Sequence, residues 1–174
     1  MEIIKTIIEG LVLIQPRVFE DERGYFMETF KDSFVKENFP DIHFIQDNES
    51  KSSYGVLRGL HFQKSPYEQT KLERVIEGEV LDVAVDIRKN SPTFRNWEAF
   101  ILSGKNRKQL FIPRGFAHGF IVLSNEAILS YKVDNHYEPN SEGIIDFMDK
   151  DLNIDWRIPK NKIITSQKDL IKGS

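Results

Sequence analysis

The chain has 174 residues, of which 27 are acidic and 24 are basic, and its formal net charge is −3. This size suits one domain with its own core, so we expect a single domain over residues 1–174. The absence of cysteine excludes disulfides, thiolate metal ligands and cysteine nucleophiles. The acidic excess is atypical of nucleic-acid-binding proteins, and no apolar run approaches the roughly 20 residues that span a bilayer. Because the N-terminus also lacks the features of a signal peptide, we expect a cytoplasmic protein without nucleic-acid or membrane partners.

The first quarter of the chain indicates short extended segments and one helix. The apolar run at 11–14 predicts a strand, since a proline follows it closely. Asp-Glu-Arg-Gly at 21–24 predicts a turn, and an extended segment follows at 25–30. Phenylalanines spaced four and five residues apart between 30 and 39 predict a short helix, which the next residue, a proline, must end.

The clearest strand pattern lies at 75–87, where Gly78 is expected to divide the region into two strands. Beyond this glycine, apolar residues at every odd position from 81 to 87 alternate with Asp82, Ala84 and Asp86. Strand geometry sends alternate side chains to opposite faces of a sheet. The apolar set and the aspartate-containing set should therefore lie on opposite faces.

Three further apolar runs, at 110–112, 120–123 and 128–133, predict more strands, and the tail from about 149 to 174 has loop composition. Scattered glycine and proline residues punctuate these runs, as in proteins built from many short strands. We therefore expect a mainly β fold with a few short helices. A jelly-roll sandwich or barrel would protect the strand edges and leave room for a small ligand.

Two polar residues interrupt the apolar segment 55–63. Strict strand alternation places Arg58 and His61 on opposite faces, unless a β-bulge at Gly59 re-aims them. Gly59 also lets another segment approach the backbone closely. At this point a core histidine satisfied by one hydrogen bond explains His61 as well as a reactive histidine does.

The spacing also matches a degenerate form of the two cupin motifs. His61, Gln63 and Glu68 follow the first motif, and His118 lies in the second. Gln63 stands where the motif has a second histidine, and an amide is a poor replacement for an imidazole ligand. Because His61, Glu68 and His118 would supply at most three ligands, we expect no metal.

Without a metal, His61 is a candidate for proton transfer, because imidazole titrates near neutral pH. The nearby cations Arg58 and Lys71 would stabilise an oxyanion or a phosphate. A solvated surface position is the competing interpretation of Lys71. The chain offers many carboxylates that could orient His61, and spacing does not choose among them.

Long motifs follow one another at 47–50, 55–63 (Gly-Val-Leu-Arg-Gly-Leu-His-Phe-Gln), 78–88, 91–94 and 109–120. In sequence and order they resemble the dTDP-4-dehydrorhamnose 3,5-epimerase family, and the resemblance extends over about residues 10–169. It implies a cupin jelly roll, a homodimer, a dTDP-sugar substrate, and neither a metal nor another cofactor.

In that family the ketone at carbon 4 of dTDP-4-keto-6-deoxy-D-glucose acidifies the hydrogens on carbons 3 and 5. A base and an acid then invert both carbons through an enolate, which gives dTDP-4-keto-L-rhamnose for L-rhamnose precursor synthesis. The resemblance implies that His61 is the base, Tyr131 the acid and Asp169 the partner of His61. It places Lys71 near the keto oxygen, where its charge would stabilise the enolate.

The resemblance also implies ten substrate-binding residues: Arg23, Phe26, Glu28, Gln46, Asn48, Arg58, His118, Tyr137, Glu142 and Lys168. The segment of about residues 1–30, which holds the first three, is expected to contribute to the site of the partner subunit. Arg58 and His118 would line the sugar–phosphate end, because a guanidinium offers paired donors to a diphosphate. Tyr137 would stack on thymine.

Three alternatives remain beside this interpretation. A related nucleotide-sugar epimerase would invert only carbon 3 or carbon 5 with the same base and acid. A metal-dependent cupin enzyme would need tightly bound iron, manganese or zinc. A non-catalytic sugar-binding cupin would not require His61, Tyr131 and Asp169 together.

Overall fold

The structure, a computed structural model, describes residues 1–170, which are arranged mainly as β-strands. The strands are β1 (Glu2–Lys5), β2 (Val12–Gln15), β3 (Val18–Asp21), β4 (Gly24–Met27), β5 (Gln46–Ser53), β6 (Leu57–Gln63), β7 (Lys71–Glu77), β8 (Glu79–Asp86), β9 (Trp97–Ser103), β10 (Gln109–Ile112), β11 (Phe116–Val122), β12 (Glu126–Val133) and β13 (Glu142–Ile144). The helices of this region are α1 (Asp32–Asn38) and three short 3-10 helices, η1 (Pro139–Ser141), η2 (Lys160–Lys162) and η3 (Lys168–Leu170). None of them is long and apolar enough to cross a membrane.

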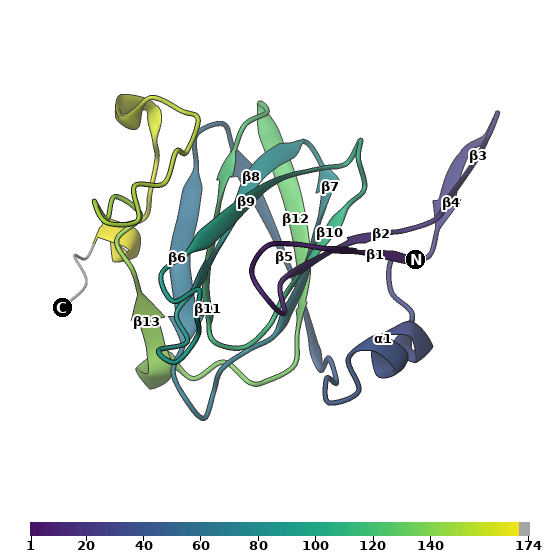
Figure 1. Ribbon diagram of the computed structural model, residues 1–174. Coiled ribbons are helices and arrows are strands. Elements are labelled where there is room, and N and C mark those ends of the chain that lie inside the picture. Colours follow the sequence, from purple (N-terminus) through teal and green to yellow (C-terminus); the bar gives the residue numbers. More distant parts are fainter. Residues whose placement is uncertain (171–174) are drawn as a thin grey trace.

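Two antiparallel sheets form a sandwich (Figure 1). The larger sheet has the strand order β1-β2-β10-β7-β12-β5, and the smaller has the order β13-β6-β11-β8-β9. The predicted mainly β sandwich is confirmed, and Gly78 separates β7 from β8 as expected.

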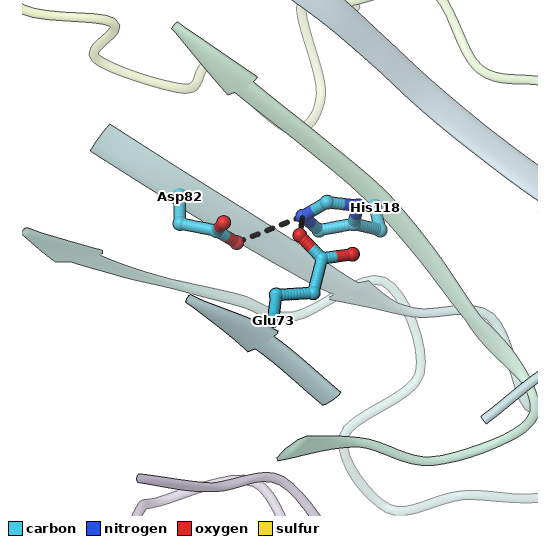
Figure 2. Close-up of side chains that lie close together, drawn as sticks. All are labelled: Glu73, Asp82 and His118. Atoms are coloured by element: carbon cyan, nitrogen blue, oxygen red, sulfur yellow. Dashed lines mark hydrogen bonds and ion pairs between the residues drawn. The ribbon is translucent and has the colours of Figure 1, made fainter. Parts of the chain in front are cut away.

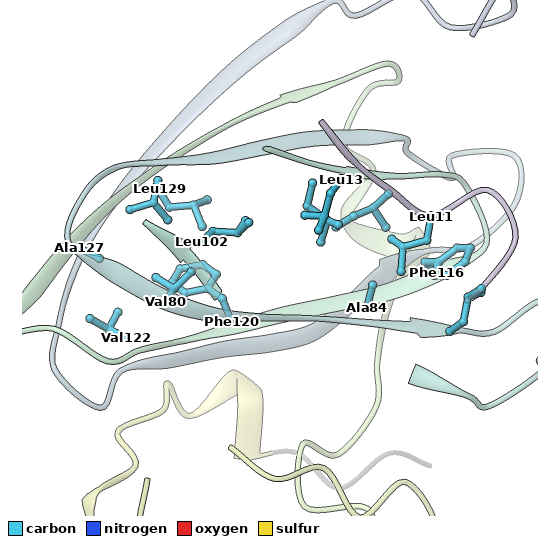
Figure 3. Close-up of a cluster of buried hydrophobic side chains, with 14 residues drawn as sticks. Leu11, Leu13, Val80, Ala84, Leu102, Phe116, Phe120, Val122, Ala127 and Leu129 are labelled. Atoms are coloured by element: carbon cyan, nitrogen blue, oxygen red, sulfur yellow. The ribbon is translucent and has the colours of Figure 1, made fainter. Parts of the chain in front are cut away.

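The main core lies between the two sheets (Figure 3). Leu13, Leu110 and Leu129 come from the larger sheet, and Val80 and Phe120 come from the smaller one. Each fully buried side chain of this kind contributes about 1.5–3 kcal/mol of transfer free energy. This core holds the sheets face to face, so polar side chains on their inner faces are also drawn together.

Strand β8 is buried on both faces, which explains its strict alternation. Leu81, Val83 and Val85 point away from the main core and pack in a second cluster with the C-terminal segment. There, Trp156 is buried, and its indole N–H donates to the Phe147 carbonyl at 2.8 Å. The tail predicted at 149–174 thus covers the outer face of the smaller sheet, and its last four residues lie outside the described part.

The helix predicted between 30 and 39 is confirmed as α1, which lies against the outer face of the larger sheet. Phe39, at its C-terminal end, stacks on Phe111 with ring centroids 3.9 Å apart. Before it, β3 and β4 pair around the predicted turn as a hairpin that extends away from the sandwich (Figure 1). β4 ends three residues before the predicted end of the extended segment.

A β-bulge in β6 decides where its polar side chains point. His61 pairs with His118 and Arg58 with Phe120, so Gly59 and Leu60 together lie opposite one residue of β11. Gly59 has a φ of +142°, and a Cβ there would lie 2.4 Å from the Gly119 Cα. Strict alternation is therefore wrong, because the bulge turns both Arg58 and His61 toward the same pocket.

Candidate active site

A pocket of about 710 Å³ lies between the two sheets, within the size range of small-molecule sites. Strands of both sheets and the C-terminal segment line it. Ten of the predicted site residues are among its lining: Asn48, Arg58, His61, Lys71, His118, Tyr131, Tyr137, Glu142, Lys168 and Asp169.

His61 and Asp169 form a close pair although they are 108 positions apart in the sequence. His61 Nε2 lies 2.5 Å from Asp169 Oδ1, and the Asp169 side chain is only 4% exposed. Ser166 Oγ donates to the other carboxylate oxygen at 2.8 Å. A bridge between Val56 and Ile164 returns the C-terminal segment to the sheet and so delivers Asp169 to the imidazole.

A second carboxylate faces the other nitrogen of His61. Strand β13 pairs with β6, which places Glu142 Oε1 3.2 Å from His61 Nδ1. Tyr137 donates its hydroxyl to Glu142 Oε2, and Lys168 forms an ion pair with the same oxygen. Burial raises the pKa of Glu142, but Lys168 and His61 together outweigh this effect and hold the pKa below its usual range. The core histidine with one hydrogen bond is therefore not what the structure shows.

Lys71 points into the pocket rather than into solvent, so its interpretation as a surface residue is wrong. Its side chain is 18% exposed, and its Nζ lies 3.2 Å from His118 Nδ1. His118 Nε2 lies 2.8 Å from Asp82 Oδ1. A neutral His118 with its proton on Nε2 therefore donates to Asp82 and accepts from the Lys71 ammonium.

Tyr131 comes from β12 and lies beside Lys71, whose Nζ is 5.7 Å from the centre of the tyrosine ring. Burial raises the pKa of Tyr131, the Glu73 carboxylate adds to this effect, and Arg58 opposes it. At neutral pH the phenol therefore keeps its proton and is able to donate it.

Behind Lys71 lies a buried cluster of Glu73, Asp82 and His118 (Figure 2). His118 Nε2 is 3.2 Å from Glu73 Oε2 as well as 2.8 Å from Asp82 Oδ1. Burial raises the pKa of Glu73 to about 7 and that of Asp82 to about 8, and it lowers the pKa of His118 to about 3. In the residues described, these three side chains bring their ligand atoms close enough together to hold a metal. His61 and Glu68 do not belong to this group, and the Lys71 ammonium beside His118 already supplies a positive charge.

Sequence reasoning overlooked Glu73 and Asp82. Asp82 was placed on the face of β8 opposite its apolar set, and that face proves to be the inner one. Glu73 lies two residues after Lys71 on β7, so strand periodicity puts both on one face. That periodicity was the available signal for Glu73.

Four predicted residues do not line the pocket of their own chain: Arg23, Phe26, Glu28 and Gln46. Arg23 and Phe26 belong to the projecting hairpin, where the Phe26 ring is among the exposed aromatic side chains and Arg23 pairs with Asp21. Gln46 lies beside the pocket, because its amide donates to Asn48 at 2.8 Å.

Known proteins with a similar sequence and fold share one activity class. The family model for dTDP-4-dehydrorhamnose 3,5-epimerase matches residues 5–173. A dTDP-4-dehydrorhamnose 3,5-epimerase from Methanothermobacter thermautotrophicus is 51% identical over 167 residues, which cover 95% of this chain and 90% of that protein. A dTDP-6-deoxy-D-glucose-3,5-epimerase from Legionella pneumophila, solved with dTDP-4-keto-L-rhamnose, is 48% identical with a TM-score of 0.94, covering 98% of this chain and 90% of that one. A 3′-monoepimerase from Streptomyces bikiniensis, solved with dTDP-quinovose, is 30% identical with a TM-score of 0.90, covering 97% and 85%.

The cupin-like sandwich and its histidine–carboxylate pocket define an enzyme of the isomerase class, a carbohydrate epimerase. Of the relatives compared, the 3,5-epimerases are markedly more similar to this chain than the monoepimerase is. The chain belongs to the dTDP-4-dehydrorhamnose 3,5-epimerase family.

Proposed function

We propose that this protein inverts carbons 3 and 5 of dTDP-4-keto-6-deoxy-D-glucose and so forms dTDP-4-keto-L-rhamnose. The observation that carries the proposal is the His61–Asp169 pair in one pocket with Lys71 and Tyr131. These groups match the three needs of inversion next to a ketone: a base, an oxyanion stabiliser and an acid.

His61 is the proposed base. Asp169 holds Nε2, so Nδ1 is the nitrogen left to take a proton from the substrate. In the free protein Nδ1 faces Glu142, which Lys168 and Tyr137 also hold. Substrate entry therefore has to displace Glu142 from Nδ1. Glu142 and its partner Lys168 would then bind the substrate, as the sequence predicts.

Lys71 and Tyr131 complete the proposed reaction. The Lys71 ammonium lies inside the pocket, where it would stabilise the charge that develops on the keto oxygen. Tyr131 would return the proton on the face opposite His61. A phenol is a weak acid, but the carbon of an enolate is a strong enough base to accept its proton.

We also propose that the protein works as a cytoplasmic homodimer in which Arg23, Phe26 and Glu28 reach the pocket of the partner. This is supported by the hairpin that extends away from the sandwich (Figure 1). Its aromatic side chains Phe19, Tyr25 and Phe26 are exposed, and a group of exposed aromatics favours contact with another protein surface.

Solvent deuterium incorporation tests the reaction. The protein is incubated with dTDP-4-keto-6-deoxy-D-glucose and a chelator in heavy water, and NMR locates the label. We expect deuterium at both carbon 3 and carbon 5. Label at one carbon would identify a mono-epimerase, and no label would rule out this substrate. Stoichiometric iron, manganese or zinc in the purified protein would favour a metal-dependent cupin.

Two variants assign the base and the acid. His61→Ala should abolish deuterium exchange while dTDP still binds, because only the base is removed. Tyr131→Phe should still lose the substrate proton but fail to return it on the opposite face. Wild-type turnover of either variant would exclude the role given to that residue.

A further inference from the structure

Two inversions by one base and one acid need a reset between them, a requirement that rests on the proposed function. In the first inversion a C–H bond breaks and His61 Nδ1–H forms, while Tyr131 O–H breaks and a new C–H forms. His61 then holds one proton too many, and Tyr131 is a phenolate. The second carbon reacts only after His61 has lost its proton to solvent and Tyr131 has regained one.

We propose that the buried cluster of Glu73, Asp82 and His118 supplies this proton to Tyr131 through Lys71. The Lys71 N–H bond breaks as Tyr131 O–H forms, and the Glu73 O–H bond then breaks as Lys71 N–H is restored. Glu73 remains as a carboxylate until a proton from water replaces the one it gave. Glu73 is thus a proton-supply residue that acts through Lys71.

The strand register brings the donor and the acceptor together. Tyr131 on β12 pairs directly with Glu73 on β7, so both side chains share the inner face of the larger sheet. Directly opposed residues have Cβ atoms about 4.5–5.5 Å apart. Lys71 Nζ lies 3.9 Å from Glu73 Oε1 and 5.7 Å from the centre of the Tyr131 ring. The Lys71 ammonium thus lies beside both Glu73 and the Tyr131 ring, and proton transfer requires it to approach each oxygen more closely than in this structure.

Charge balance places a proton in the cluster. Two carboxylates, both almost fully buried, share one ammonium, that of Lys71, because His118 is neutral. A buried group with excess negative charge is costly, so one of the two carboxyls keeps a proton. Asp82 Oδ2 is buried without a hydrogen-bond partner in the described structure, and Glu73 Oε2, buried as well, has only the 3.2 Å ion-pair contact with His118 Nε2 that Figure 2 draws as a dashed line. One of these oxygens is free to carry that proton.

The acidity of the groups suits the transfer. Burial raises the pKa of Glu73 to about 7, whereas Tyr131 titrates above the ordinary tyrosine value of about 10. A phenolate at Tyr131 therefore takes a proton from Glu73 in a downhill step. Arg58 and His61 face the same pocket. They lie on β6 of the smaller sheet, whereas Glu73 and Lys71 are two residues apart on β7 of the larger sheet.

Glu73→Gln tests the proposal, because the amide keeps the shape of the side chain and has no acidic proton. Single-turnover reactions in heavy water are quenched over time, and NMR counts substrate, singly inverted species and doubly inverted product. We expect the first inversion to stay within about threefold of wild type, while the second slows at least tenfold and the singly inverted species accumulates. Equal slowing of both inversions would show a structural role and overturn the proposal, and so would no slowing at all.

Two controls separate the possible failures. Glu77→Gln changes an exposed glutamate on the same strand and should leave both inversions unchanged. If Glu73→Gln does not fold, Asp82→Asn replaces it, because loss of the second carboxylate removes a negative charge that raises the pKa of Glu73 and so weakens its hold on a proton. Label at only one carbon in the wild-type protein would refute the proposed function itself, whereas label at both with equally slowed variants refutes only the proton supply.

Discussion

Asp86 and Asp82, both on β8, show how the surroundings of a side chain, rather than its residue type, set its charge. Burial raises the pKa of Asp86, but Arg88, Ser91 and Thr93 donate to it, and together they bring its pKa well below the usual range. Asp82 is as deeply buried and receives one hydrogen bond, from His118, so its pKa rises to about 8. The first aspartate is a structural anion, and the second belongs to a cluster that exchanges a proton near neutral pH.

The cluster should make the protein less stable as the pH rises from 6.5 to 8. Glu73 and Asp82 release their protons near pH 7 and 8 in the folded protein, but near pH 4 in the unfolded chain. The folded state therefore binds more protons in this range, and the free energy of unfolding falls with pH by about 2 kcal/mol. His118 acts in the opposite direction only between about pH 3 and 6.5. Urea unfolding at the two pH values measures this fall, which Glu73→Gln should reduce; an unchanged fall would contradict the assignment.

Asp169→Asn should lower turnover by a factor of about 10²–10⁴, because an amide neither fixes the His61 tautomer nor stabilises the charged imidazole. Binding of dTDP, measured by calorimetry, should change little, since Asp169 is buried behind the imidazole. Asp151→Asn, at an exposed aspartate of the same C-terminal segment, is the matched control. Comparable turnover in the two variants would exclude the dyad.

Strand β6 shows how one irregular element creates a site. A regular strand would send Arg58 and His61 to opposite faces, whereas the bulge at Gly59 and Leu60 brings both to the pocket. It also sends Leu60 into the apolar cluster under the C-terminal segment. The same two-residue bulge thus serves both the reactive face and the packing that holds Asp169 in place.

Gly59→Ala should destabilise the protein by several kcal/mol and reduce its activity. Its φ of +142° is unfavourable for alanine, and the new Cβ would meet the Gly119 backbone at 2.4 Å. Gly24→Ala is the matched control, because Gly24 has a φ of +124° but no atom within 4 Å of an added Cβ. It should cost only about 1–2 kcal/mol. Thermal unfolding of both variants measures the difference, and equal losses would show that strain, not the close approach, matters.

At the scale of the whole molecule, three distant parts meet at the pocket. The inner faces of the two sheets supply His61, Lys71 and Tyr131, and the C-terminal segment supplies Asp169. The hairpin of β3 and β4 lies apart from this assembly, which leaves Arg23 without a role inside its own chain. A symmetric dimer would give every hairpin the same place at a second pocket.

Mixed dimers test this arrangement. His61→Ala and Arg23→Ala, each inactive alone, should together regain about a quarter of wild-type activity after unfolding and refolding as a mixture. Half of the dimers would then be mixed, and one of the two pockets in each would be intact. A mixture of His61→Ala and Asp169→Asn should regain nothing, because both residues belong to one chain's pocket. Failure of the first mixture would place Arg23 in its own subunit or outside the site.

Local sequence pattern was enough to predict the β architecture, because the alternation at 81–87 and the break at Gly78 follow from local strand geometry. Its motifs also led to His61, Tyr131 and Asp169 through a family resemblance. The contact of Asp169 with His61 became visible only in the folded chain, since contact over 108 positions depends on how the C-terminal segment packs. The structure also revealed the cluster of Glu73, Asp82 and His118, which come from three different strands. Their pKa values depend on burial and on charged neighbours from other strands, and local spacing does not encode either.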